Sequence, residues 1–267
     1  MILITLIIVL VIVLLLTFRN RKTSNYKYDY NCYLLTLPES TKRRQKFFKY
    51  HDSSIPIQTV YGVNTKSVKK AREYEELIEP EYFEKAVEMH YDKTVKRPDI
   101  TYFNLGAIGA MLGHVNMMKT CEDKYALIFE DNVIIKSKRF YKEVQKVIDE
   151  LGDDFEMCFF HCLSRVPTQV DGKLERVVWV SSMKCYLVNV ENMKKYLKYY
   201  FPMDNHVDNK TEDIIAQGAR VYYKDLRRYM KIDRSGPSTI GHSDHGRKEY
   251  FSRQNPSLTP RDIKFGY

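Results

Sequence analysis

The residues best suited to chemistry follow a short apolar run near the middle of the chain. Residues 125–129 (Tyr-Ala-Leu-Ile-Phe) lead directly into Glu130, Asp131 and Asn132. Two carboxylates and an amide supply hard oxygen donors, which suit Mn²⁺ or Mg²⁺ holding a diphosphate. The same side chains could instead cap the loop or the helix that follows. The spacing alone leaves both interpretations open.

Alternating apolar patterns predict the elements that must position these residues. Runs typical of buried strands lie at residues 32–37, 125–129, 157–160, 177–180 and 185–188. Helical patterns lie at residues 41–50, at 104–115, where Asn104 can cap the first turn, and at 140–151. Strands that alternate with helices predict a single α/β domain with a mostly parallel sheet, in which ligands bind at the carboxyl ends of strands. Residues 130–132 stand at such an end.

The N-terminal residues 1–18 differ sharply from the rest of the chain. They carry no charged side chain and are mostly Ile, Leu and Val, and roughly 27 Å of helix nearly crosses the roughly 30 Å apolar part of a bilayer. A cleaved signal peptide would begin with basic residues, whereas here the basic residues follow the apolar run: Arg19, Arg21, Lys22 and Lys27. We therefore expect a single transmembrane helix at 1–18, a polar tether at 19–30, the main domain at 31–245 and a tail at 246–267. The positive-inside rule then places the domain on the cytoplasmic side of the membrane.

Composition restricts the function classes without selecting one. The formal net charge of +9 fits nucleic acid, an anionic membrane face or a phosphate-bearing substrate. Because the lysines are spread along the chain and no nucleic-acid motif is present, a basic membrane-tethered nucleic-acid binder is the weakest alternative, and we expect no nucleic-acid partner. Five cysteines, an odd number, fit a reducing compartment. Cys158, His161 and Cys162 suggest half of a zinc site, but we assign them to a core strand because no second cysteine pair exists.

Two motifs occur in an order and spacing found in a known enzyme family. Residues 106–114 (Gly-Ala-Ile-Gly-Ala-Met-Leu-Gly-His) precede residues 126–132 (Ala-Leu-Ile-Phe-Glu-Asp-Asn). They resemble the Gly-Glu-Ile-Gly-Cys, Leu-Ser-His and Ile-Leu-Glu-Asp-Asp pattern of the family-25 glycosyltransferases, which include lipooligosaccharide and collagen galactosyltransferases. Residues 35–37 with Arg43 resemble the family's Ile-Asn-Leu and following arginine. The resemblance continues through residues 61–64, 185–188, 202–204 and 242–244, and it covers about residues 31–245.

The resemblance implies a GT-A fold, which has a Rossmann-like, mostly parallel sheet. It also implies an inverting, metal-assisted transfer of a hexose, galactose or glucose, from a UDP-sugar to a hydroxyl of a saccharide, lipid-linked or protein acceptor. The implied donor contacts are Thr36, Leu37, Arg43, Arg44, Asn64, Gly109, His114 and Glu130. The implied ligands of Mn²⁺ or Mg²⁺ are Asp131, Asn132, His242 and Asp244. A carboxylate must take the proton of the acceptor hydroxyl, and the candidates in order of preference are Asp204, Asp213 and Asp208.

The chain departs from the family pattern at three positions. Asn132 replaces the second aspartate of Glu-Asp-Asp, Ala107 replaces a glutamate and Gly113 replaces a serine. Asparagine can coordinate through its carbonyl oxygen but brings no charge, so a metal should bind less tightly. A catalytically degenerate, membrane-tethered protein that binds a sugar nucleotide is therefore the first alternative. At single positions, His114 could be a buried hydrogen-bonded histidine, and Arg43 could be a solvated helix residue.

Overall fold

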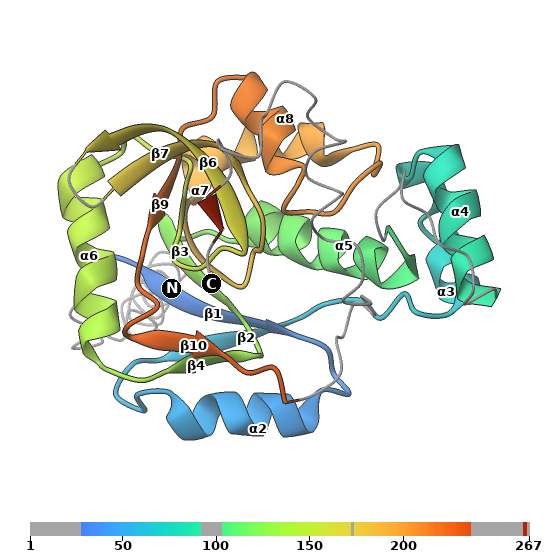
Figure 1. The fold of residues 1–267 in the computed structure, drawn as a ribbon. Helices are drawn as coiled ribbons and strands as arrows, with labels where there is room; N and C mark the ends of the chain where they lie inside the picture. The colour runs from blue at the N-terminus through green and yellow to red at the C-terminus, as the bar shows by residue number, and fades with distance from the viewer. Residues whose placement is uncertain (1–27, 92–102, 172–173, 236–263, 266–267) are drawn as a thin grey trace, which may run out of the picture.

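The computed structural model describes residues 28–91, 103–171, 174–235 and 264–265 of the chain. Over these residues, the centre is a nine-stranded mixed sheet with the order β11-β6-β7-β9-β5-β8-β3-β1-β2 (Figure 1). Its strands are β1 (Asn31–Thr36), β2 (Ile57–Tyr61), β3 (Tyr125–Glu130), β5 (Met157–Phe159), β6 (Ser164–Asp171), β7 (Leu174–Val180), β8 (Cys185–Asn189), β9 (Val221–Lys224) and β11 (Lys264–Phe265). A separate antiparallel pair joins β4 (Val133–Ile135) to β10 (Met230–Ile232).

Six of the nine strands run in one direction. β1 is parallel to β2 and β3, and β5 is parallel to β9. β8 lies antiparallel between β3 and β5, and β7 lies antiparallel between β9 and β6, so β6 shares the direction of β9. The predicted α/β class with a mostly parallel sheet is therefore confirmed. The reversed direction of β8 was not predicted, and it brings the start of that strand to the edge where β1 and β3 end.

Alternating side chains in the central strands build one core on each face of the sheet. Leu35 packs on the face covered by α5, whereas Leu34 packs on the opposite face with Phe47 of α2 and Phe140 of α6. The α5 face carries α3 (Val68–Arg72), α4 (Pro80–Tyr91), α5 (Leu105–Thr120), α7 (Val190–Lys194), η2 (Leu197–Tyr200) and α8 (Thr211–Ala216). The opposite face carries α2 (Thr41–Tyr50) and α6 (Arg139–Leu151).

The strands and helices predicted from the sequence are all present. The predicted cap of α5 is also confirmed, because the Asn104 side chain accepts a hydrogen bond from the amide of Ala107 at 3.1 Å. The five cysteines are free and buried. Cys158 and Cys162 belong to the cores on opposite faces of the sheet, so they do not form one site.

Several predictions from the chain ends cannot be followed in the structure. The predicted anchor at residues 1–18 lies outside the described residues, as do His242 and Asp244. Of the helices that the structure describes, none is long and apolar enough to cross a membrane.

Candidate functional site

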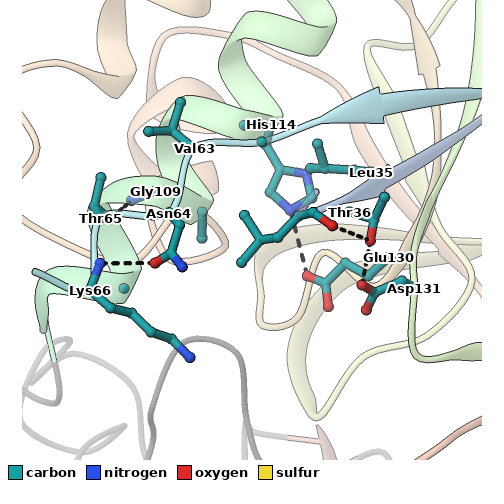
Figure 2. A pocket seen from close by; sticks show the side chains of 15 residues that line it. Leu35, Thr36, Val63, Asn64, Thr65, Lys66, Gly109, His114, Glu130 and Asp131 are labelled. Carbon is teal, nitrogen blue, oxygen red and sulfur yellow. Dashed lines mark hydrogen bonds and ion pairs between the residues drawn. The ribbon is translucent and has the colours of Figure 1, made fainter. Parts of the chain in front are cut away.

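A pocket opens at the carboxyl ends of β1, β2 and β3, where the sequence predicts a ligand (Figure 2). It is lined by residues 35–37 at the end of β1, residues 62–66 after β2, and residues 130–131 at the end of β3. The remaining wall is one face of α5, formed by Gly106, Gly109, Ala110, Gly113 and His114. Four segments that are distant in sequence thus converge because parallel strands end at the same edge of the sheet.

The pocket has two chemically different ends. Figure 2 shows Asn64, Thr65 and Lys66 at one end and His114, Glu130 and Asp131 at the other. The lining also includes the apolar side chains of Leu35, Leu37 and Val63. Apolar lining combined with polar groups at each end is typical of a site for a small amphipathic ligand.

Helix α5 approaches the loop after β2 closely because residue 109 is glycine. The amide of Gly109 donates a hydrogen bond to the Thr65 hydroxyl oxygen at 2.8 Å (Figure 2), and that hydroxyl donates to the carbonyl of Leu105. A Cβ atom at position 109 would lie 2.7 Å from the Thr65 hydroxyl oxygen and closer still to the carbonyl oxygen of Val63. Gly109 therefore fixes the pocket wall by allowing helix and loop to touch.

Replacing Gly109 by Ala is expected to destabilise the protein by about 1–3 kcal/mol, because the added methyl group overpacks against backbone. Chemical denaturation measures this loss as a fall in the free energy of unfolding. Gly113→Ala is the matched control on the same helix, since its Cβ would meet the Leu35 methyl groups at 3.4 Å and the Cα of Gly62 at an ordinary contact distance of 3.7 Å. The better helix propensity of alanine, about 1 kcal/mol, should offset most of that contact. Equal losses in the two variants would contradict the assigned role of Gly109.

Asp131 is the centre of a hydrogen-bonded group at the charged end of the pocket. Its carboxylate accepts a hydrogen bond from the Thr36 hydroxyl at 2.6 Å (Figure 2) and pairs with Nε of Arg43 at 2.9 Å. Burial raises the pKa of Asp131, and the Thr36 hydrogen bond and Arg43 offset only part of that effect. The Nη1 of Arg43 is buried and has no hydrogen-bond partner among the described residues. It is a donor available to a ligand.

Glu130 is held by groups on two neighbouring elements. His114 of α5 lies with Nε2 3.5 Å from the Glu130 carboxylate and with Nδ1 2.7 Å from the Tyr186 hydroxyl. With its proton on Nε2, the ring donates to Glu130 and accepts from Tyr186. Burial acts to raise the pKa of Glu130, but Lys184, His114 and Arg43 together lower it to about 2. Glu130 is therefore ionised at neutral pH.

A polar cluster around Ser182 adjoins this acidic strand end. Ser182 has a φ of 91°, a conformation that a residue with a side chain rarely adopts and that is found most often at functional sites. Its amide donates to the Asp208 carboxylate at 2.5 Å, and its hydroxyl lies 3.3 Å from both Nζ of Lys184 and Nδ1 of His161. The carbonyl of Lys184 accepts the amide of Glu130 at 2.8 Å. The cluster is thus joined directly to the end of β3.

His161 gives this cluster a measurable pH dependence. Burial, with the positive charges of Lys184, Arg234 and Arg227, lowers the pKa of His161 from 6.5 to about 4. At pH values between these two pKa values, His161 is protonated more in the unfolded chain than in the folded chain. The free energy of unfolding should therefore fall as the pH drops from about 6.5 to about 4. The loss attributable to His161 should be about 3 kcal/mol or less. His161→Gln should remove that part of the loss when denaturation at about pH 7 and about pH 4.5 is compared. A variant with the unchanged pH dependence would show that His161 is not responsible.

The described residues do not form a site for the expected Mn²⁺ or Mg²⁺. Both carboxylate oxygens of Asp131 are engaged, by Arg43 and Thr36, and Glu130 faces His114. The Oδ1 of Asn132 is buried without a hydrogen-bond partner in the described part of the chain, but it is one neutral donor. Within that same part, no three His, Cys, Asp or Glu side chains come together in a geometry that could hold a metal. A cation bound to Asp131 would compete with Arg43 and Thr36 for its oxygens.

Most of the predicted donor-binding residues lie together. Six of them line the pocket: Thr36, Leu37, Asn64, Gly109, His114 and Glu130. Asp131, which the sequence predicts as a metal ligand, lines the pocket as well. Arg43 reaches Asp131 from α2. Arg44 instead donates to the carbonyl of Leu37 at 2.9 Å and lies over the ring of Tyr61. It supports the end of β1 rather than lining the pocket.

The three candidate bases lie in two different environments. Lys210, which is 5% exposed, pairs with Asp204 at 2.8 Å and with Asp213 at 2.5 Å. Asp208 instead accepts the amide of Ser182 and is joined through it to the acidic strand end. The role of each aspartate stays a prediction, but Asp208 alone has a hydrogen-bonded connection to the pocket edge.

Lys184 and Ser182 were not singled out in the sequence, and His161 was considered only as a zinc ligand. All three precede or follow short core strands, β5 and β8, at the edge where β3 ends. The available signal was the group of polar residues Ser181, Ser182 and Lys184 just before the apolar run of β8. It is informative only once β8 is known to be antiparallel to β3.

Comparison with known proteins adds a family assignment. The solved structures that match include "UDP-glucose pyrophosphorylase complexed with UDP-glucose", with a TM-score of 0.42 and 8% identity over 85% of this chain and 98% of that chain. UDP-glucose pyrophosphorylase from Acinetobacter baumanii matches with a TM-score of 0.42 and 9% identity over 86% of this chain and 99% of that chain. A CMP:2-keto-3-deoxy-manno-octonic acid synthetase complexed with CTP matches with a TM-score of 0.39 and 8% identity over 74% of this chain and 89% of that chain. TM-scores this low carry no argument about this chain. No curated protein sequence matches it. The model of glycosyltransferase family 25 (LPS biosynthesis protein) matches residues 30–211, more than half of the sequence and all three strand ends of the pocket, so the chain belongs to glycosyltransferase family 25.

Proposed function

We propose that the protein transfers a hexose from a nucleotide-diphosphate sugar to an acceptor hydroxyl. The observation that carries this proposal is the two-ended pocket at the carboxyl ends of the three parallel strands. Its apolar lining and the Asn64–Lys66 end suit a nucleoside, and the His114–Asp131 end suits the diphosphate and the sugar. UDP as the nucleotide, and galactose or glucose as the sugar, follow from the family resemblance.

The reaction proposed is a single displacement with inversion. The acceptor oxygen forms a bond to the anomeric carbon while the bond from that carbon to the β-phosphate oxygen breaks. The leaving nucleoside diphosphate keeps the electron pair, and the hydroxyl proton passes to a carboxylate within hydrogen-bond reach. The negative charge that develops on the leaving diphosphate must be held by groups already in position, while the carboxylate that takes the proton becomes neutral.

We propose Asp208 as that carboxylate, in preference to Asp204 and Asp213. Asp204 and Asp213 share the buried cation Lys210, which engages both carboxylates. Asp208 is half-buried and is oriented by the amide of Ser182, next to Lys184. A base that is fixed in orientation and close to the end of β3 fits the geometry of the displacement better.

The acceptor and the cellular location stay proposals from the sequence. A hydroxyl of a saccharide, a lipid-linked glycan or a protein would satisfy the chemistry. The apolar residues 1–18 would hold the domain at a membrane, on the cytoplasmic side according to the charges that follow them.

A panel of nucleotide sugars tests the proposed function. The full chain is incubated with each donor, with Mn²⁺ and separately with EDTA, and nucleotide release and sugar transfer are measured. We expect release of one nucleotide, UDP, from one or two donors only. Tight binding of a sugar nucleotide without release from any donor would overturn the proposal and leave the degenerate binding protein. Binding to nucleic acid in place of sugar nucleotides would overturn both.

A further inference from the structure

Basic residues on three separate segments lie next to the end of β3, which forms the acidic end of the pocket. Arg43 comes from α2, Lys184 from the residue before β8, and Arg234 from the residues after β10. Each segment is fixed at the end of β3 by a contact of its own. Arg43 pairs with Asp131 at 2.9 Å, and the carbonyl of Lys184 accepts the amide of Glu130 at 2.8 Å.

Arg234 is placed by its two neighbours. The amide of Asp233 donates to the carbonyl of Asn132 at 2.7 Å. Lys46 of α2 pairs with the Asp233 carboxylate at 2.6 Å and donates to the Ser235 hydroxyl at 3.1 Å. Residue 234 is therefore held between the end of β3 and α2, and its side chain is exposed. The basic cluster is defined here as Arg43, Lys184 and Arg234.

One carboxylate at this edge is already paired with a cation. Asp131 has Arg43 as its direct partner at 2.9 Å, whereas Glu130 lies 3.5 Å from the His114 ring and is joined through its amide to the carbonyl of Lys184. Lys184, Arg234 and Arg227 also lie near enough to His161 to act on it electrostatically, so positive charge extends across the edge. A dication entering here would meet like charges, whereas a diphosphate would meet donors.

We propose that Arg43, Lys184 and Arg234 bind the diphosphate of the donor directly and neutralise the leaving group in place of a divalent cation. The buried Nη1 of Arg43, which has no hydrogen-bond partner in the described residues, supplies a donor to a phosphate oxygen. When the bond between the anomeric carbon and the phosphate oxygen breaks, the new negative charge develops beside these groups. The proposal rests on the proposed function, because the diphosphate belongs to its donor.

Nucleotide binding by the full chain tests the cluster separately from turnover. Calorimetric titrations with uridine and with UDP are made in EDTA and repeated with Mn²⁺. We expect UDP to bind more tightly than uridine by about tenfold or more in EDTA, and Mn²⁺ to change the UDP affinity by less than about threefold. A UDP affinity that appears only with Mn²⁺ overturns the proposal.

Two variants that each remove one positive charge show which residues of the basic cluster contribute to UDP binding. Arg43→Gln and Lys184→Gln should each weaken UDP binding by about tenfold while leaving uridine binding unchanged. Lys146→Gln is the control, since Lys146 is an exposed residue of α6 whose ammonium pairs with Glu143 on the same helix at 3.0 Å. Unchanged UDP affinity in both variants, or an equal loss of uridine and UDP affinity, overturns the proposal.

The outcomes separate this inference from the proposed function. UDP binding in EDTA without transfer of any sugar would contradict the transferase and leave the basic cluster standing. Transfer that requires Mn²⁺, with UDP binding lost in EDTA, would leave the transferase standing and contradict the cluster. No UDP binding under either condition would overturn both.

Discussion

Replacing Asp131 by Asn is expected to lower kcat/KM for sugar transfer by roughly a hundredfold or more. Asparagine has nearly the same shape, but it cannot balance the guanidinium of Arg43, which pairs with Asp131 at 2.9 Å. A partly buried charge left without its partner reorients or draws in water. The donor groups of Arg43 would then lose their position at the leaving group. Initial rates over a range of donor concentrations measure the effect.

A double-mutant cycle shows whether Asp131 acts through Arg43. If it does, Asp131→Asn combined with Arg43→Gln should lose little more activity than the worse single variant, because the two side chains act as one unit. Thr36→Val is the matched control: it removes only the 2.6 Å hydrogen bond to the same carboxylate and keeps the ion pair. Its expected loss is about tenfold. Fully additive losses in the double variant would contradict the coupling.

The sequence predicts the pocket because local pattern and strand direction agree there. Residues 125–129 form an uninterrupted buried run that is followed by two carboxylates, and β1 pairs directly with both β2 and β3 and ends in the same direction. Parallel strands place their ends at one edge whatever the loops do, so Thr36, Asn64 and Glu130 meet as expected. The Asn104 cap is likewise a local feature that needs no tertiary information.

The Ser182 cluster could not be predicted in the same way. β8 is antiparallel to β3, so the residues before it, not after it, lie at the binding edge. Strand direction depends on how β6 and β7 reverse the chain, and apolar runs carry no information about direction. The ion pair between Arg43 and Asp131 was missed for a related reason. A motif with two adjacent carboxylates suggests a cation, and it does not reveal that an arginine from another helix already occupies one of them.

The choice among the three aspartates is a choice between two kinds of environment. Asp204 and Asp213 are bound to one buried lysine, an arrangement that stabilises the loop between η2 and α8. Asp208 is tied to a serine whose backbone is strained, with φ 91°. Backbone strain persists only where surrounding contacts impose it, and it is concentrated at functional sites. The strained backbone of Ser182 therefore supports Asp208, which accepts the hydrogen bond of the Ser182 amide, as the proposed base.

Asp208→Asn is expected to lower kcat by about a hundredfold to ten-thousandfold, the range for removal of a general base. The donor KM should change little, because the amide oxygen of asparagine can still accept the hydrogen bond from Ser182. The acid limb of the pH–rate profile should disappear in the variant, since the group that must be ionised is gone. A purely structural role would not remove that limb.

Asp204→Asn and Asp213→Asn are the matched controls, because each makes the same chemical change and leaves Lys210 with one carboxylate partner. We expect both to keep kcat within about threefold of the wild type. Loss of activity and of the acid limb in Asp204→Asn, with Asp208→Asn active, would instead assign the base to Asp204, as the sequence resemblance prefers. We expect Asp208→Asn to be the inactive variant, because the amide of Ser182 holds Asp208 in one orientation, whereas Asp204 and Asp213 share Lys210.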